Sequence, residues 1–487
     1  MLKEIIKEAG VNSSEEKLAG YADKTFLGLW AYPNVYSDEG IGKNKVGVEL
    51  CDLLVVFNDY VIIFSDKDCA FNNNIDVKVA WGRWFRKSVV DSSKQLYGAE
   101  KFIRDYPGRL FLDKECTREF PFEIKKNTRF FLVAVTNNTA IGAKRFFDNV
   151  ASGSYCSLLN VFPYNASECH DNPFIIGDLY PEKTFIHVLD EMTLDLIFSS
   201  LNTITDFIGY LCEKEKVVRN KMLISSGGED ATLGLYLLND GCLIDKINGD
   251  NSGFVIHEHM WAEYEKSLKH QVHESFRKGS VFWDELIQNF SRSILSAKVG
   301  LGQENNFNSH EIVVRELASE GRKSRYSLST AFLDKLKQVP SDRRSSRIVK
   351  SLDVEGKYYL FLFFPRDDKQ DYNEYRSERV RVINLYATVA HYKYRYIKKL
   401  VIIATEPKNA QGRSEDIIAF DFFRPPSREE KELARAIMKG DSILTDFTSN
   451  SFEQGNFVGV ASRADKIKRN DKCPCGSGVK YKRCHGG

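Results

Sequence analysis

The chain has 487 residues, 43% of them hydrophobic, and its 69 lysine and arginine residues nearly balance 67 aspartate and glutamate residues. This length allows several folded domains of about 100–200 residues each. The formal net charge of only +2 excludes a strong electrostatic field over the whole surface, so any site for nucleic acid must be local. No stretch approaches the ~18 apolar residues of a membrane span, and the first residues mix charge and apolar groups too closely for a signal peptide. We therefore expect a cytoplasmic protein with no membrane partner.

Residues 1–150 have the pattern of an α/β domain. A capping signal at Ser13–Glu16 opens a helical apolar pattern. The apolar runs Leu50–Phe57 and Tyr60–Phe64 have strand length and flank a two-residue turn, which predicts a buried hairpin. A long amphipathic helix follows, and the apolar run Arg129–Val135 completes the predicted sheet.

Residues 151–335 are predicted to form a mainly helical middle domain. Apolar residues recur at helical spacing in Thr193–Lys216 and in Met260–Val299. The clearest strand signal in this block is Leu233–Leu238. The block contains no motif that assigns it a function.

Residues 336–461 are predicted to form a second small α/β region, which opens with the polar and basic connector Ser341–Arg347. Residues 462–487 are predicted to be a charged linker followed by a small knuckle. The whole chain is thus expected to be a multidomain protein of mixed α/β class. In the third block the expected strands are Tyr358–Phe364, Leu400–Thr405 and Ile417–Phe422, and the expected helix is Tyr375–Tyr392.

The end of the chain has the spacing of a zinc site. Three of the ten cysteines lie here as C-x-C, then eight residues, then C-H. Four such sulfur and nitrogen ligands satisfy tetrahedral zinc, and the glycines between them permit the tight turns that a short loop around one ion needs. Because almost nothing apolar can be buried, the metal must supply the folding free energy, on the order of 10 kcal/mol. The expected ligands are Cys473, Cys475, Cys484 and His485.

These residues resemble the SEC-C motif, which is found at the tail of the SecA translocase and appended to many otherwise unrelated bacterial proteins. A Gly-Ser-Gly run and a Lys-Tyr-Lys run also stand at the motif's places. The resemblance implies a closed, structural zinc site and therefore a binding role. The lysines and arginines around it suit either phosphates or an acidic surface of a protein partner, and the residues do not decide between these.

Polar residues mark the ends of the predicted elements in the first block. Asp52 lies at the mouth of a buried strand, Lys67 ends the next strand, and Gln95 lies on the following helix. Glu16 lies in the first helix. Each has an ordinary alternative. Glu16 could belong to a capping box with Ser13. Asp52 could be a residue at a strand end, Lys67 could lie in a solvated loop and Gln95 on an exposed helix face.

This order of residues resembles the PD-(D/E)xK nuclease superfamily, most closely its NERD and RecB-like branches. The resemblance implies a restriction-endonuclease-like α/β core in which acids hold Mg²⁺ or Mn²⁺ and a lysine orients or activates the attacking water. Carried over, Glu16 is the acid of the first helix, Asp52 the metal ligand and Lys67 the motif lysine. Gln95 is the glutamine that helps to hold the metal site and the substrate backbone.

One position departs from the family pattern. Two residues before the lysine, where the family has an acid, this chain has Ser65, and Asp66 faces the other side of the strand because side chains alternate. Three explanations remain open at this stage. Glu49 or Asp68 supplies the second acid, a bulge turns Asp66 inward, or the site binds nucleic acid without cleaving it.

The resemblance therefore implies a metal-dependent nuclease whose substrate is DNA in preference to RNA, and the habits of the family suggest a part in DNA processing or in defence. A basic stripe along the predicted long helix, interleaved with aromatic residues, suits a phosphate backbone. The alternative is a catalytically inactive adaptor with a degenerate nuclease fold and a zinc docking motif. The stripe consists of Arg83, Arg86, Lys87, Lys94, Lys101 and Arg104.

Other chemistries find no support in the sequence. His257 and His259 lack the spacing of a zinc protease motif, and they are interpreted as polar positions on a helix. The chain has neither a phosphate-binding loop that ends in Gly-Lys-Ser or Gly-Lys-Thr nor a Gly-x-Ser-x-Gly elbow.

Overall fold

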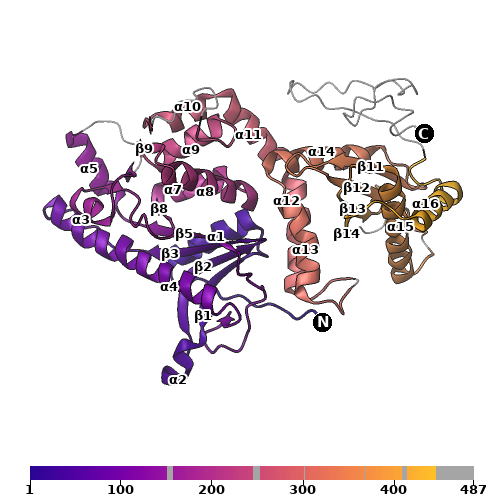
Figure 1. Cartoon of the computed structure of the whole chain (residues 1–487), viewed down its shortest axis with the longest axis horizontal. Helices are drawn as coiled ribbons and strands as arrows, with labels where there is room; N and C mark the ends of the chain where they lie inside the picture. The colour runs from indigo at the N-terminus through magenta and orange to yellow at the C-terminus, as the bar shows by residue number, and fades with distance from the viewer. Residues whose placement is uncertain (151–156, 245–252, 301, 368, 409–413, 446–487) are drawn as a thin grey trace. The chain divides into compact units, whose positions relative to one another are not determined.

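The computed structural model describes residues 1–150, 157–244, 253–300, 302–367, 369–408 and 414–445. The chain forms two compact units, residues 1–329 and 330–487 (Figure 1). The predicted linker and zinc knuckle lie outside the described residues. None of the described helices combines the length and the apolar character needed to cross a membrane.

The first unit is built on a six-stranded mixed sheet with strand order β4-β1-β2-β3-β5-β8. Strands β1 to β4 pair antiparallel, whereas β5 runs parallel to β3 and β8 runs parallel to β5. Because β8 belongs to this sheet, the sheet continues past the domain boundary expected at residue 150. The strands are β1 (Ala31–Ser37), β2 (Val48–Phe57), β3 (Tyr60–Lys67), β4 (Leu110–Phe111), β5 (Arg129–Thr136) and β8 (Ile186–Asp190).

The predicted hairpin is confirmed as β2–β3. The strands pair from Phe57 opposite Tyr60 to Leu53 opposite Phe64. Asn58, at the turn, has a φ of 53°, in the left-handed region that asparagine tolerates better than most residues. The tight turn therefore fixes which β2 residue lies opposite which β3 residue.

Helices cover both faces of this sheet. On one face, α3 (Val77–Phe85) and α4 (Asp91–Asp105) run as one long helix joined by the π turn Arg86–Val90, and α4 packs on β2, β3 and β5 (Figure 1). On the other face, Phe64 contacts aromatic rings of α7 (Glu191–Ser200) and α8 (Ile204–Arg219). The strands are apolar on both faces for this reason.

The first helix, α1 (Ser13–Phe26), begins differently from the expectation. Its N-cap is Asn12, whose side chain accepts bonds from the backbone N–H groups of Ser14 and Glu15. The predicted cap at Ser13 is wrong, because the asparagine one residue earlier already satisfies these donors. Glu15 completes the cap by accepting a bond from the backbone N–H of Val11.

The remainder of the first unit is mostly helical and includes a second, small sheet of order β10-β9-β6-β7. These strands are β6 (Leu159–Val161), β7 (Ile175–Ile176), β9 (Leu223–Ser226) and β10 (Phe254–Ile256). The other helical elements are η1 (Asp38–Gly40), α2 (Ile41–Asn44), α5 (Ala140–Val150), α6 (Ala166–Asp171), α9 (Glu229–Leu238), α10 (Met260–Lys266), α11 (Leu268–Gly279), α12 (Val281–Leu295), α13 (Phe307–Ala318) and α14 (Arg322–Gln338), the last of which crosses the division between the units.

Two sequence predictions for this part need correction. The expected strand Leu233–Leu238 is the second half of α9. This helix is buried on most sides, with Leu233 fully inaccessible, so its apolar run looks the same as that of a buried strand. The helix expected over Thr193–Lys216 is two helices, because Thr203 caps the start of α8.

The second unit contains a four-stranded sheet of order β11-β12-β13-β14. Strands β12 and β13 are parallel and α15 connects them, as the alternating pattern predicted. The connector Ser341–Arg347 extends into the edge strand β11, whose half-exposed residues explain its polar sequence. The elements are β11 (Ser345–Lys350), β12 (Lys357–Phe363), α15 (Tyr372–Lys393), β13 (Lys399–Thr405), β14 (Glu415–Asp421) and α16 (Arg428–Asp441).

Candidate active site

The candidate site lies where β2 begins and β3 ends. Regular pairing between these strands stops at Leu53 opposite Phe64. Just beyond that point, the backbone N–H of Asp66 donates a hydrogen bond to the Asp52 carboxylate. Asp52 is 5% exposed, so an acidic side chain is held almost out of water at the edge of the sheet.

Two carboxyl groups are in contact at this edge. The Glu49 carboxyl is hydrogen-bonded to that of Asp52, and the pKa of Glu49 is raised to about 7. The largest cause is the partial burial of the carboxyl group, followed by the bond to Asp52 and by the Asp52 charge. Glu49 as a residue is exposed, so the desolvation applies to the carboxyl end that meets Asp52. Without a cation, the pair therefore holds a proton near neutral pH.

Lys67 lies close enough to Glu49 to oppose this rise in pKa. It ends β3 and is half-buried. Side-chain alternation puts it on the same face of β3 as Ser65, the face that α4 covers. The structure thus brings the predicted motif lysine close enough to the acid pair for its charge to act on Glu49.

Gln95 reaches the same region from α4. The Ser65 hydroxyl donates to the Gln95 side-chain oxygen at 3.0 Å and to the Ser92 hydroxyl at 3.3 Å. Ser65 is fully buried. The position where the family pattern has an acid is therefore occupied by a small hydroxyl that links β3 to the helix.

Asp66 faces the opposite side of β3. Its carboxylate accepts bonds from the Ser14 hydroxyl and from the Asn137 amide, the latter at 2.9 Å. Burial raises the pKa of Asp66, and these two hydrogen bonds oppose that rise. Pairing of β3 with β5 continues without interruption as far as Lys67 opposite Thr136. No bulge turns Asp66 toward the acid pair.

The first helix contributes a different acid from the predicted one. Glu16 is exposed, whereas the charge of the preceding Glu15 raises the pKa of both Glu49 and Asp66. Glu15 and the predicted Glu16 lie about 100° apart around the helix, so their side chains point in different directions. Asp68 accepts a bond from Asn138 at 2.6 Å and is exposed.

The donor set suits an open oxygen site. Within the described ranges, no group of three or more histidine, cysteine, aspartate or glutamate side chains could hold a metal ion. Mg²⁺ is commonly held by one or two carboxylates, with water and substrate phosphate completing its six positions. The two contacting carboxyls of Glu49 and Asp52 fit that requirement, and they do not fit a closed site.

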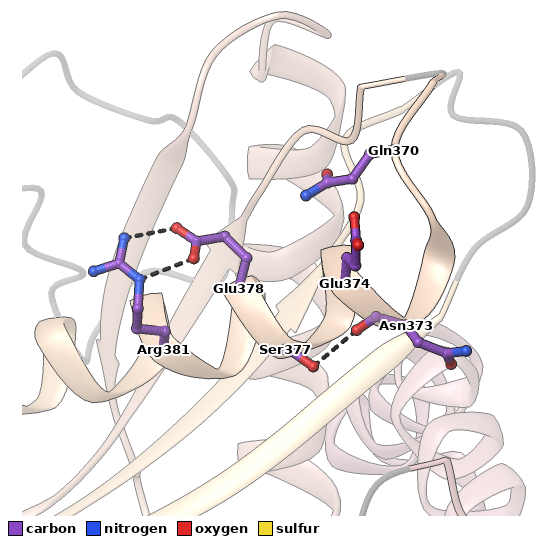
Figure 2. Close-up of a pocket in the computed structure, with 6 residues that line it drawn as sticks. All are labelled: Gln370, Asn373, Glu374, Ser377, Glu378 and Arg381. Atoms are coloured by element: carbon purple, nitrogen blue, oxygen red, sulfur yellow. Dashed lines mark hydrogen bonds and ion pairs between the residues drawn. The ribbon is translucent and has the colours of Figure 1, made fainter.

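A pocket of about 610 Å³ in the second unit is a weaker candidate. Figure 2 shows that its lining comes from α15 and from Gln370 just before this helix. Glu378 and Arg381 pair with each other at 2.6 Å, and the Ser377 hydroxyl donates to the Asn373 carbonyl at 2.8 Å. These local bonds are ordinary for an exposed helix face, so the pocket adds no chemistry.

Comparison with known proteins identifies the end of the chain and little more. Residues 469–487 match the family described as the SEC-C motif. Similar curated proteins are SecA protein translocase subunits. That of Solibacter usitatus is 36% identical over 95 residues, which is 16% of this chain and 9% of the relative. That of Francisella tularensis subsp. novicida is 31% identical over 121 residues, 24% and 12% of the two chains.

A third example, from Ralstonia pickettii, is 38% identical over 77 residues, which is 15% of this chain and 8% of the relative. The chain thus spans about a tenth of the length of these relatives. No solved structure matches the chain. The motif supports structural zinc, while its predicted ligands Cys473, Cys475, Cys484 and His485 lie outside the described residues.

Proposed function

We propose that the chain is a divalent-metal-dependent phosphodiesterase that cleaves nucleic acid at the Glu49–Asp52 pair. The observation that carries the proposal is the Asp52 carboxylate, nearly buried and held by the Asp66 backbone N–H, with the Glu49 carboxyl beside it. Two like charges in contact at a partly buried edge disfavour each other, and a divalent cation removes that penalty. The pair is therefore a preformed site for Mg²⁺ or Mn²⁺.

The neighbouring residues then take the following roles. Asp52 and Glu49 bind the cation, which supplies Lewis-acid activation of the phosphodiester and of the attacking water. Lys67, near Glu49, orients that water and stabilises charge on the phosphate. Gln95 contacts Ser65 and holds the substrate backbone on the α4 side. In this arrangement Glu49 supplies the second acid, which the family has at the position of Ser65.

The proposed partner is DNA, bound along the helix that covers this face. Several side chains of the basic stripe are exposed, and Arg83, Lys87 and Lys101 have no carboxylate partner among the described residues. Lys94 and Arg104 are paired with Asp91 and Glu100. Unpaired cations are the ones free to replace counterions on a phosphate backbone.

The inactive adaptor is the second candidate, and Ser65 favours it. A fully buried serine bonded to Gln95 and Ser92 is a satisfied structural contact. Under this reading the protein binds nucleic acid through the same face and cleaves nothing. The SEC-C tail, holding zinc through Cys473, Cys475, Cys484 and His485, docks a partner protein or nucleic acid in either case.

We place the protein in the cytoplasm of a bacterial cell. The cysteines that the structure describes are free thiols, Cys51, Cys69, Cys116, Cys169, Cys212 and Cys242. Reduced thiols without disulfides are the usual state in that compartment.

The test is a cleavage assay on linear, supercoiled and single-stranded DNA, with Mg²⁺, Mn²⁺ or chelator. Metal-dependent cleavage that is lost in Asp52→Asn and in Glu49→Gln supports the proposal. Glu16→Gln is the matched control, because Glu16 is an exposed acid on the neighbouring helix and should keep full activity. DNA binding without metal-dependent cleavage would favour the adaptor.

A further inference from the structure

Asp66 makes one contact through its backbone and others through its side chain, and these lie on different sides of β3. Its backbone N–H donates to the Asp52 carboxylate, and its own carboxylate bonds Ser14 and Asn137 on the other side of the strand. We propose that Asp66, clamped by Ser14 and Asn137, is a positioning residue that fixes the Asp52 carboxylate for the divalent cation. This inference rests on the proposed function.

The need for such a clamp follows from the strand pairing. The β2–β3 ladder ends at Leu53 opposite Phe64, so ladder bonds do not hold the segment around Asp66 against β2. On its other edge, β3 remains paired with β5 through Lys67 opposite Thr136. The side that faces Asp52 is therefore the free side, and the Asp66 N–H is the group that spans it.

The clamp ties together three separate parts of the first unit. Ser14 lies in the first turn of α1, Asp66 lies in β3, and Asn137 directly follows β5. The Asn137 amide lies 2.9 Å from the Asp66 carboxylate, 3.3 Å from the Ser14 hydroxyl and 3.4 Å from the Lys67 carbonyl. It therefore contacts the backbone of the motif lysine as well as the clamp.

Loss of one of the two hydrogen bonds to the Asp66 carboxylate should weaken binding of the cation at Asp52. Asp66 is 7% exposed, and a buried carboxylate that loses a donor must shift or take up water. A shift of the Asp66 backbone moves the N–H that orients Asp52. Residues that orient metal ligands typically change metal affinity by about 10–100-fold when removed.

The experiment measures Mn²⁺ affinity of the full chain by titration calorimetry, with no DNA present. Ser14→Ala removes one donor and should weaken Mn²⁺ binding about 10-fold, whereas Ser14→Thr keeps the hydroxyl and should restore it. Asp66→Asn should weaken binding at least as much. Thr25→Val is the matched control in α1. Among the described residues the Thr25 hydroxyl bonds only the Phe198 carbonyl, at 3.4 Å, so its loss should leave Mn²⁺ affinity unchanged.

The outcomes separate this inference from the proposed function. Wild-type affinity in Ser14→Ala and Asp66→Asn, with Mn²⁺ binding still lost in Asp52→Asn, overturns the clamp and leaves the metal site intact. Absence of Mn²⁺ binding in the wild type overturns both. If Asp66→Asn does not fold, the Ser14→Ala and Ser14→Thr pair decides alone. Equal weakening in Thr25→Val would show a general loss of helix α1 and would also overturn the clamp.

Discussion

The chain holds two clusters of carboxylates, one fully buried and one only partly buried, and their charges are balanced in different ways. In the second unit, Arg379 is fully buried between Glu406 and Asp416 and bonds both of them. In the first unit, Glu49 and Asp52 meet each other, and no arginine is ion-paired with either of them in the part of the chain that the structure describes. One cluster is neutralised by the protein and the other is left with its charge.

The difference separates an acid cluster whose charges are all paired from one that has no ion-paired arginine among the described residues. Arg379 is held by further bonds, since its guanidinium also contacts the Ser414 carbonyl at 3.1 Å and the Ser414 hydroxyl at 2.9 Å. Every charge in that cluster has a partner, so a ligand would gain nothing there. The Glu49–Asp52 pair stores repulsion that an added cation can relieve, and such unfavourable arrangements concentrate at functional sites.

The largest effect should come from the acid pair itself. Asp52→Asn removes the charge that is held at the mouth of β2, and we expect metal-dependent cleavage of DNA to be abolished, because the proposed cation loses a ligand. Folding should be intact, because asparagine can still accept the bond from the Asp66 N–H. Cleavage rates and circular dichroism spectra of the variant and the wild type provide the measurement. Undiminished cleavage in Asp52→Asn would contradict the proposal that the acid pair binds the catalytic cation.

Breaking the neutralised cluster should instead cost stability. Arg379→Leu leaves Glu406 buried without its arginine, while Asp416 keeps its ion pair with Arg376, and removal of one partner from a buried pair typically costs about 3–5 kcal/mol. Urea denaturation that follows the unfolding of the second unit measures this loss in the free energy of unfolding. Arg381→Leu is the control on the same helix. Arg381 is exposed and, in the part of the chain that the structure describes, is ion-paired only with Glu378, so its effect should be small. Equal losses in both variants would contradict the distinction.

The acid pair should make stability fall with rising pH. Glu49 has a pKa of about 7 in the folded protein against 4.5 ordinarily, so the folded state binds this proton more tightly than the unfolded chain does. The free energy of unfolding therefore decreases as the pH rises from about 4.5 to about 7. Thermal unfolding in chelator should show this decline in the wild type and a flatter profile in Glu49→Gln, while Mg²⁺ should restore wild-type stability at pH 8. An unchanged slope in Glu49→Gln would refute the assignment.

The smallest effect on the body of the protein should come from the tail. The acid pair is formed before a cation arrives, whereas the SEC-C segment has almost nothing to bury without zinc. Metal analysis should find about one zinc per chain, lost in the double variant Cys473→Ser, Cys475→Ser. Melting of the two folded units should be nearly unchanged in that variant. A large drop in melting temperature would mean that the tail packs against one of them.

Some of this could be predicted from the sequence. The hairpin was visible because two apolar runs of strand length flank a two-residue turn, and the strands and helix of the second unit followed from alternation. The tail was identified by the spacing of its cysteines and histidine together with the short runs between them. The start of the first helix was predicted one residue late, because the N-cap is Asn12 and not Ser13.

The candidate site was only partly readable for a related reason. Asp52 and Lys67 were predicted from their positions at strand ends and Gln95 from its place on the following helix, but the sequence left Glu49 as one of several acids. The role of Asp66 could not be predicted, because it depends on Ser14 and Asn137, which are distant in the chain and meet only in the folded unit. Long-range hydrogen bonds leave no periodic signal in one sequence.

The two-residue turn at Asn58 has a consequence for how this protein can evolve. It sets the register in which Asp52 reaches Asp66, and side chains in a strand change face at every residue. Substitution of single site residues, as at Ser65, leaves that register in place. Insertion or deletion of one residue at the turn would move the whole of one strand to the opposite face. Descendants of this chain can therefore exchange acids at the site, but the length of the turn should stay fixed.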